Sequence, residues 1–153
     1  MSPPPESFQR IEELEKTYHG SCHCGAVRFE CKTDLAQGTS RCNCTMCAKG
    51  RYWKTLVKAE SFRLLQGKDA LRDYQFGSNT IHHLFCQTCG IKPFGRAHLD
   101  VEFRGQPLRG EFYAINLACL DDVAPSDLAA IPVHYEDGRA DHWERPPAET
   151  RHL

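Results

Sequence analysis

The chain has 153 residues, of which 41% are hydrophobic and 25% are charged. This length is typical of one domain of ~100–200 residues, and the composition is that of a globular protein rather than a disordered one. Lys and Arg number 19 against 20 Asp and Glu, which gives a formal net charge of −1. Because domains that bind nucleic acid usually carry a basic excess, we expect no nucleic-acid partner.

Apolar runs in the chain are short. The longest, Leu128–Val133, is interrupted by Pro132, whereas a transmembrane helix needs ~20 consecutive apolar residues. The first residues, Met1–Glu6, lack the cationic start and the apolar core of a secretory leader. We therefore expect a cytoplasmic protein that has no membrane partner.

The predicted elements are mostly short β-strands. At the N-terminus, the spacing of Phe8, Ile11 and Leu14 favours a short helix over Glu6–Lys16. The next segment, Ala26–Cys31, alternates apolar and polar residues as a half-buried strand does. Further strands are expected between glycines and polar turns, at Tyr52–Lys58, Phe62–Gln66, Leu71–Phe76, Thr80–Phe85 and Glu111–Ala118.

Two later segments favour short helices. One helical turn fits between Cys44 and Gly50, and Ala124–Ala130 favours a second short helix with Ser126 as its cap. The whole pattern predicts a mainly β fold with few helices. We expect a partly helical N-terminal segment at residues 1–17, one domain at residues 18–135 and a tail at residues 136–153 that lies on the surface.

The nine cysteines are the most informative residues of the chain. An odd number, in a chain of this size without an export signal, disfavours a disulfide framework. Close spacing instead suits a metal that gathers two thiolates from one turn, and in a reducing compartment it indicates zinc. Seven cysteines fall in three tight clusters: Cys22-His23-Cys24, Cys42-Asn43-Cys44-Thr45-Met46-Cys47 and Cys86-Gln87-Thr88-Cys89. The other two, Cys31 and Cys119, are expected to be buried packing residues.

The first and third clusters together form the usual ligand set of a closed structural zinc, with four thiolates from Cys22, Cys24, Cys86 and Cys89. A glycine follows each cluster and permits a tight turn whose backbone N–H groups point at the sulfurs. The site would join segments about sixty residues apart, so its binding energy would contribute to folding. The alternative is a set of four buried thiols without metal.

The middle cluster offers three thiolates, Cys42, Cys44 and Cys47, and no fourth ligand is close in sequence. Three protein ligands and one open position are the pattern of a catalytic zinc, so we predict a second zinc ion that can accept water or a substrate sulfur. The alternatives are a cluster without metal and a swapped pairing with Cys86 and Cys89. A third alternative is a closed site with a distant fourth ligand, taken from Cys31, Cys119, His82, His83 or His98.

Basic residues flank the middle cluster, namely Arg41, Lys49, Arg51 and Lys54. They form either a solvated rim or the group of side chains that receives the carboxylates of an anionic thiol. A histidine pair, His82 and His83, lies on a predicted strand, so the two rings point to opposite faces. We expect one of these rings to be exposed and assign a function to neither.

Three motifs in this order, Gly20–Val27, Cys42–Cys47 and Phe85–Gly90, resemble those of the glutathione-dependent formaldehyde-activating enzyme family, whose domain is shared with centromere protein V. The resemblance runs from Tyr18 to Leu120 and implies an antiparallel β-tent fold. It also implies a structural zinc on Cys22, Cys24, Cys86 and Cys89, and an active-site zinc on Cys42, Cys44 and Cys47. The implied activity is the formation of S-hydroxymethylglutathione from formaldehyde and glutathione, a carbon–sulfur lyase reaction.

The chemistry of the middle cluster is consistent with this activity. Zinc deprotonates a coordinating thiol, and the thiolate is the nucleophile that would attack an aldehyde. We therefore predict an enzyme with two zinc ions per chain that forms or cleaves a glutathione–aldehyde adduct, with glutathione and an aldehyde as its partners. The alternatives are a two-zinc binding module without turnover and a related zinc enzyme acting on another thiol or electrophile.

Overall fold

Two β-sheets form the framework of the computed structural model, which describes residues 14–103 and 105–153. The smaller sheet has three antiparallel strands in the order β1-β2-β5, formed by Lys16–Ser21, Arg28–Thr33 and Phe62–Gln66. In β2, Phe29 and Cys31 are buried while Arg28 and Lys32 are exposed. This alternation is that of a strand with one face on the core.

The larger sheet has seven strands in the order β10-β3-β4-β9-β8-β7-β6. Its neighbouring strands are antiparallel except β10 and β3, which are parallel. The longest strands, β8 and β9, form a hairpin that pairs along its whole length. The bounds are β3 Thr39–Cys42, β4 Trp53–Lys58, β6 Leu71–Tyr74, β7 Ile81–Cys86, β8 Phe94–Phe103, β9 Gln106–Asn116 and β10 Val133–Glu136.

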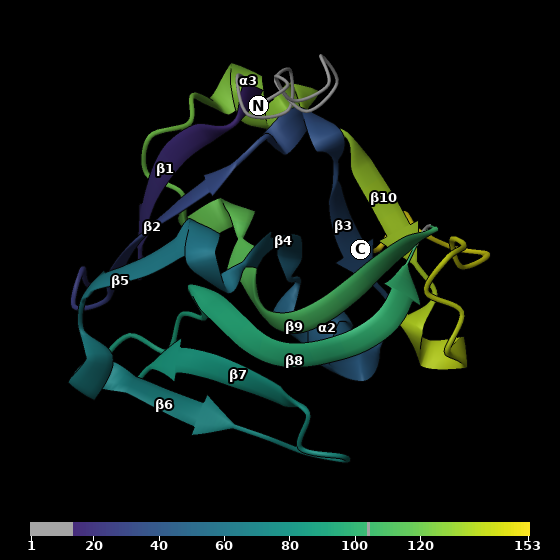
Figure 1. Ribbon diagram of the computed structural model, residues 1–153, viewed down its shortest axis with the longest axis horizontal. Helices are drawn as coiled ribbons and strands as arrows, with labels where there is room; N and C mark the ends of the chain where they lie inside the picture. Colours follow the sequence, from purple (N-terminus) through teal and green to yellow (C-terminus); the bar gives the residue numbers. More distant parts are fainter. Residues whose placement is uncertain (1–13, 104) are drawn as a thin grey trace, which may run out of the picture.

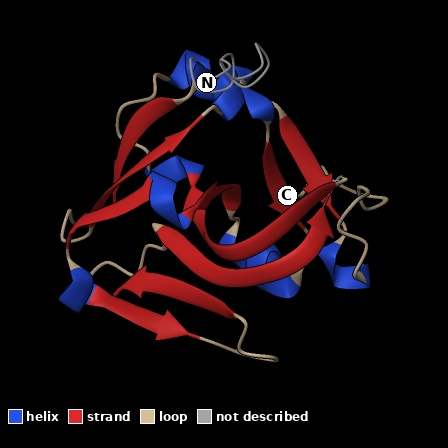
Figure 2. Cartoon of the chain, viewed as in Figure 1, coloured by secondary structure: helices blue, strands red, loops and turns tan. Residues whose placement is uncertain are grey.

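The strands surround the middle of the molecule on three sides (Figure 1). The sheet of β1, β2 and β5, the β3–β10 pair and the β6–β7 hairpin form the sides, and the β8–β9 hairpin curves across between them. Helical segments are short and lie in the connections between strands or, for the last one, after β10 (Figure 2). They are α2 Thr45–Gly50, α3 Pro125–Ala130 and the 3₁₀ turns Leu35–Gln37, Ala59–Ser61, Lys68–Ala70, Leu117–Cys119 and Gly138–Ala140.

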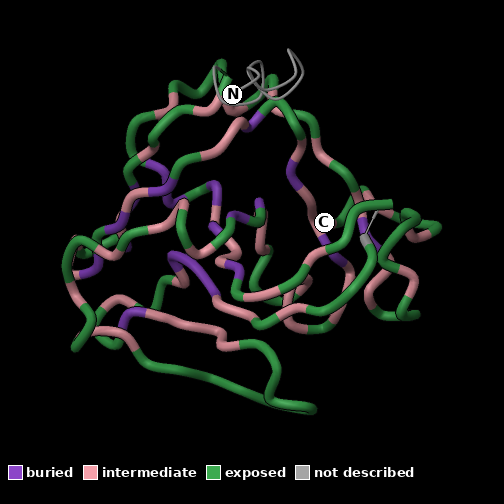
Figure 3. The backbone as a smooth tube through the Cα atoms, in the orientation of Figure 1, coloured by how far each residue is buried: buried purple, intermediate pink, exposed green. Residues whose placement is uncertain are grey.

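The hydrophobic core lies between the two sheets. Buried side chains from β2, β8, β9 and the turn after β9 meet there, including Phe29, Phe94, Ile115 and Leu117. Burying each such side chain contributes about 1.5–3 kcal/mol relative to leaving it exposed. The two isolated cysteines, Cys31 and Cys119, belong to this core as expected. Figure 3 shows that exposed backbone follows β6 and the turn after it, on the outside of the molecule.

The prediction of a mainly β fold is confirmed, with differences in detail. The predicted helix over Glu6–Lys16 lies almost entirely outside the described residues, and Lys16 itself begins β1. Four strands were not predicted: β1, β3, β8 and β10. The predicted cap of α3 was wrong because Ser126 lies inside the helix, which begins with Pro125 after Ala124. Proline suits this first position because its φ is already helical.

Two other features bear on the predictions. Neither histidine of the pair is fully exposed: His82 and His83 are both half-buried, so the expectation of one exposed ring was wrong. The ring of His82 lies 2.6 Å from Asp73, and the ring of His83 stacks on Phe76. Among the described residues, no helix is long and apolar enough to cross a membrane.

Candidate metal centres

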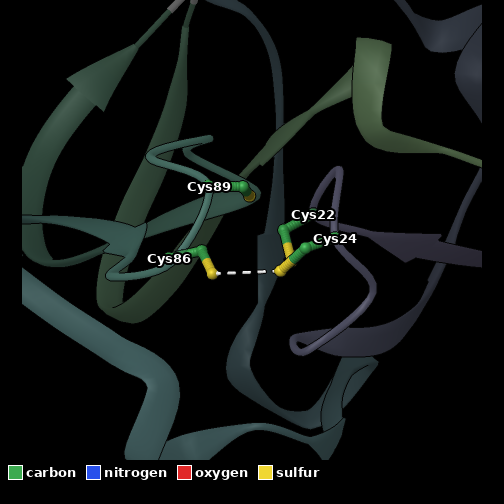
Figure 4. Close-up of side chains that lie close together, drawn as sticks. All are labelled: Cys22, Cys24, Cys86 and Cys89. Atoms are coloured by element: carbon green, nitrogen blue, oxygen red, sulfur yellow. Dashed lines mark hydrogen bonds between the residues drawn. The ribbon is translucent and has the colours of Figure 1, made fainter.

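The first cysteine group brings together two loops that are far apart in sequence. Cys22 and Cys24 lie in the loop after β1, Cys86 ends β7, and Cys89 lies in the turn that follows. Their four sulfur atoms all lie within 4.8 Å of one another, and Figure 4 shows the two pairs facing each other. The Sγ of Cys24 lies 3.7 Å from that of Cys22 and 3.7 Å from that of Cys86.

This sulfur spacing fits a tetrahedral metal site. Four sulfurs at a Zn–S distance of ~2.3 Å lie about 3.8 Å apart at the tetrahedral angle, whereas a disulfide needs ~2.05 Å. Tight turns hold the two loops in place, with Gly25 at a φ of +79° and Gly90 at a φ of +77°. Both values fall in the left-handed region that glycine adopts without strain. The amide of Val27 also donates to Cys22 Sγ at 3.3 Å.

Backbone amides stabilise negative charge on part of the first group. Hydrogen bonds from the backbone amides of Cys24 and Ile91 lower the pKa of Cys89 to about 6. A hydrogen bond from the backbone amide of Cys89 lowers the pKa of Cys86. At Cys24 an amide hydrogen bond from Ala26 lowers the pKa, but burial and the neighbouring thiols outweigh it and raise the pKa to about 11. The first group therefore favours thiolates at Cys86 and Cys89, and all four of its cysteines ionise together only when a cation is bound.

The second cysteine group lies at the junction of β3 and α2. Cys42 ends β3, Cys44 caps the helix by accepting a hydrogen bond from the amide of Cys47 at 3.4 Å, and Cys47 lies within the helix. The amide of Cys44 donates to Cys42 Sγ at 3.3 Å. All three sulfurs lie within 4.8 Å of one another. One short strand-to-helix turn thus gathers three ligands on one side.

Three sulfurs this close do not ionise together without a cation. Hydrogen bonds from the thiols of Cys42 and Cys47 lower the pKa of Cys44, and the same contacts with Cys44 raise the pKa of Cys42. The pKa of Cys47 is raised by its hydrogen bonds to Cys42 and Cys44 and by burial. A bound divalent cation would offset this mutual repulsion, so the donor set fits a metal ion.

The two groups are separate in the described part of the chain. Each forms its own set of sulfurs, so the swapped pairing of the middle cluster with Cys86 and Cys89 is not found. None of the candidate fourth ligands joins the second group within 4.8 Å: Cys31, Cys119, His82, His83 or His98. The second group therefore presents three protein ligands.

A narrow pocket borders the second group on one side. It is lined by Arg41, Cys42, Cys47, Ala48, Arg51, Tyr52 and Leu153. The two arginines bring positive charge beside the sulfurs, and the Arg41 guanidinium lies 4.9 Å from the centroid of the Trp53 ring. The hydroxyl of Tyr52 donates to the carbonyl of Ala114 at 2.6 Å, which fixes this wall of the pocket to β9.

The four basic residues near the second group do not act as one rim. Arg41 and Arg51 line the pocket, and Lys49 is exposed on α2. Lys54 instead points into the protein, where its Nζ lies 2.5 Å from Oε1 of Glu136 and 2.9 Å from Oγ of Ser40. Burial lowers the pKa of Lys54, but the charge and hydrogen bond of Glu136, together with the nearby Cys47 and Cys42, outweigh burial and raise the pKa. Its assignment to the rim was therefore wrong.

Asn43 is a structural residue that the sequence analysis missed. It lies between two ligands of the second group, and its side chain donates to Asp137 Oδ1 at 2.8 Å and accepts from the amide of Arg139 at 2.9 Å. Its own amide donates to the carbonyl of Glu136 at 3.1 Å. The spacing of the cysteines contains no signal for these contacts, because their partners lie more than ninety residues further along the chain.

Comparisons with known proteins agree with this geometry. Residues 17–135 match the sequence model of a family described as glutathione-dependent formaldehyde-activating enzyme. A protein from Rhodobacter sphaeroides whose crystal structure is known is 34% identical to this chain in sequence. The match covers 75% of this chain and 98% of that chain, and the two structures superpose with a TM-score of 0.59. The family match ends one residue before Glu136, so the segment that binds Asn43 lies beyond it.

Proposed function

The chain belongs to the family of glutathione-dependent formaldehyde-activating enzymes, and from this premise we propose that it is a zinc enzyme of the carbon–sulfur lyase type. Its reaction joins glutathione and formaldehyde or separates them again. In the forward direction the thiol sulfur forms a bond to the carbonyl carbon, and the carbon–oxygen π bond breaks. The thiol proton ends on the oxygen, and the product is S-hydroxymethylglutathione.

The two cysteine groups have different roles in this proposal. Cys22, Cys24, Cys86 and Cys89 hold a structural zinc, because four thiolates close the coordination shell. Cys42, Cys44 and Cys47 hold the active-site zinc. A zinc ion with three thiolate ligands keeps one position open and lowers the pKa of a thiol that enters it.

The observation that carries the proposal is the pocket beside the second group. Cys42 and Cys47 line it together with Arg41 and Arg51. Glutathione is an anionic peptide thiol, and an arginine can bind a carboxylate through two parallel hydrogen bonds. The arginines therefore orient the peptide while its sulfur faces the three cysteines. The wall made by Tyr52 is fixed by its bond to Ala114, which keeps the pocket in shape.

The test is the rate of adduct formation measured by NMR exchange between glutathione and ¹³C-labelled formaldehyde. The zinc-loaded protein should raise the exchange rate in proportion to its concentration, and Cys44→Ala should return the rate to that of buffer. Arg51→Ala should raise the glutathione KM more than it lowers kcat, since it removes binding rather than the reacting group. An exchange rate no higher than that of buffer with the same amount of free zinc overturns the proposal and favours a binding module.

The substrate is tested by comparing thiols. A cobalt-substituted second site should gain a sulfur-to-metal band when glutathione is added, and S-methylglutathione, which has no ionisable thiol, should leave the spectrum unchanged. If the arginines select the carboxylates, glutathione should outcompete a small neutral thiol, and added salt should reduce that preference. A response to neutral thiols but not to glutathione would keep the enzyme class and reject the substrate.

A further inference from the structure

The segment from residue 136 to residue 153 lies beyond the family match and packs against the second cysteine group. We call it the tail. Its first anchor is Asn43, which makes side-chain and backbone hydrogen bonds to Glu136, Asp137 and Arg139. Since Asn43 stands between two of the metal-ligand candidates, the start of the tail is held directly at the site.

The middle of the tail touches a ligand sulfur. A methyl group built on Gly138 would lie 2.5 Å from Cys42 Sγ and 2.6 Å from the ring of Trp143. Real carbon atoms do not approach so closely, so the backbone at Gly138 rests against the sulfur and the indole ring covers the same place. One side of the second group is thus closed by the tail.

The last residues of the tail reach the pocket itself. Arg51 donates from Nη1 to the carbonyl oxygen of His152 at 3.1 Å, and Leu153 lines the pocket with Cys42 and Cys47. With Leu153 in place, the pocket is too narrow to hold a water molecule. The end of the tail therefore occupies Arg51 and the space beside two cysteine sulfurs, which is the place where we propose that glutathione binds.

The end of the tail has a defined shape. The amide of Leu153 donates to the carbonyl of Thr150 at 3.0 Å, and the side chain of Arg151 pairs with Glu149 at 2.9 Å. This turn presents residues 152 and 153 to the pocket. The contacts of the turn are exposed to solvent, so they can exchange with a competing ligand at moderate cost.

We propose that residues 152 and 153 are an internal competitor of the substrate: they occupy the pocket beside the second metal site, and a peptide thiol binds only when the tail end leaves. The identity of the displaced ligand rests on the proposed function, but the occupation of the pocket does not. If the tail end is bound most of the time, only a small fraction of the molecules has an open pocket, and the apparent affinity for the thiol falls in proportion to that fraction. Loosening the tail end should therefore strengthen thiol binding.

The experiment uses the double variant Glu149→Ala/Leu153→Ala, which removes the ion pair of the turn and the side chain in the pocket. The matched control is Leu65→Ala, a truncation of an exposed leucine on β5. The first measurement is the rate at which a chromophoric chelator takes zinc from the second site, seen as the faster of two phases. The second is the dissociation constant of glutathione from the cobalt spectrum.

We expect zinc release several-fold faster and glutathione binding several-fold tighter in the double variant, with neither quantity changed in Leu65→Ala. Faster zinc release from the double variant, with no change of the cobalt spectrum on adding glutathione to any of the proteins, including the parent, would support the occupied pocket. The same result would contradict the proposed function. Unchanged release would show that the tail end does not cover the site, and weaker glutathione binding would show that it builds the site. Either of these two results overturns the proposal.

Discussion

The Nζ of Lys54 lies 2.5 Å from the Oε1 of Glu136, and both side chains are largely shielded from water, with exposures of 15% and 4%. Lys54 belongs to β4, whereas Glu136 ends β10 and stands opposite Cys42 in the parallel register. Lys54 also donates to Ser40 on β3. The ammonium group of Lys54 therefore ties three neighbouring strands together beside the second cysteine group.

Replacing Lys54 should destabilise the protein strongly. Lys54→Met leaves the carboxylate of Glu136 buried without its cation, and breaking such a pair costs about 3–5 kcal/mol. Lys49→Met, on the exposed face of α2, should change the free energy of unfolding by no more than about 0.5 kcal/mol. Urea denaturation of the zinc-loaded proteins measures both. Equal effects of the two substitutions would mean that the ion pair contributes nothing specific.

The protein should contain two zinc ions per chain. Two separate sulfur sets are present in the described residues, one of four and one of three. Elemental analysis of protein prepared under reducing conditions with zinc present gives the ratio. Limited chelation should remove one ion first, because the site with three protein ligands has an exchangeable position. A folded chain with one zinc ion or none at saturation would contradict the two-site interpretation.

Cysteine substitutions in the two groups should have unequal effects on folding. Cys86→Ala breaks a site that joins positions 62 residues apart, and structural zinc binding contributes on the order of 10 kcal/mol in small zinc-binding peptides. Cys44→Ala affects three ligands within six residues, so the fold should survive while the second zinc is lost. Thermal melts combined with zinc analysis separate the two. A Cys44 variant that melts as early as the Cys86 variant would refute the division into structural and open sites.

Gly138→Ala should weaken zinc binding at the second site. The new methyl group would lie 2.5 Å from Cys42 Sγ, so the sulfur or the tail must move. Loss of a group that orients a metal ligand typically costs about 10–100-fold in affinity, and we expect a loss of this size when Cys42 is displaced. Gly50→Ala is the control, because its methyl group would meet only Lys92 Nζ at 3.6 Å. Competition with a chelator measures the zinc affinity of the second site. An unchanged zinc affinity in Gly138→Ala would show that the tail moves aside without displacing the sulfur of Cys42.

The pair of His19 and Asp122 should make stability depend on pH. The ring Nδ1 lies 3.0 Å from Asp122 Oδ2, and this hydrogen bond raises the pKa of His19. A raised pKa in the folded state stabilises the protein below the ordinary histidine value of about 6.5, and the benefit is lost as the pH rises through the folded value. The difference in urea midpoint between the parent and His19→Gln should be larger at pH 6 than at pH 8.5.

Asp122→Asn provides the matched test of that pH effect. It removes the main carboxylate that favours the charged imidazole, while Glu30 stays 3.3 Å from the ring Nε2. The difference between pH 6 and pH 8.5 should therefore shrink when His19→Gln is made in this background. Because both positions are partly exposed, the effect should be small and should weaken with added salt. The same pH dependence in both backgrounds would assign it to another group.

Local spacing was sufficient to predict the two cysteine pairs and the triplet, because each comes from one turn of the chain. Cys22 with Cys24, and Cys86 with Cys89, each lie on a single loop. The strand β2, which has one buried face, was also predictable, since its apolar and polar residues alternate. These features depend on neighbours within a few residues.

Features that depend on distant partners could not be predicted. In β3 the buried positions are Thr39 and Cys42, a pattern with no apolar alternation, and its parallel partner β10 begins only at Val133. Lys54 looked like a rim residue because its partner Glu136 lies 82 positions away. The tail end in the pocket is a similar case, since the carbonyl that Arg51 binds lies 101 positions away.

The parallel pairing of β10 with β3 also affects the order in which the protein can be made. A ribosome releases β3 and β4 long before it has synthesised Val133–Glu136. Until then β3 is an edge strand with unpaired backbone groups, which favour association with other chains. Cys42, at the end of β3, and Lys54, on β4, gain their neighbours in β10 only after this late strand has been synthesised. The nascent chain can thus assemble its first cysteine group before β10 exists, whereas the surroundings of the second are completed only after Val133–Glu136 has been synthesised.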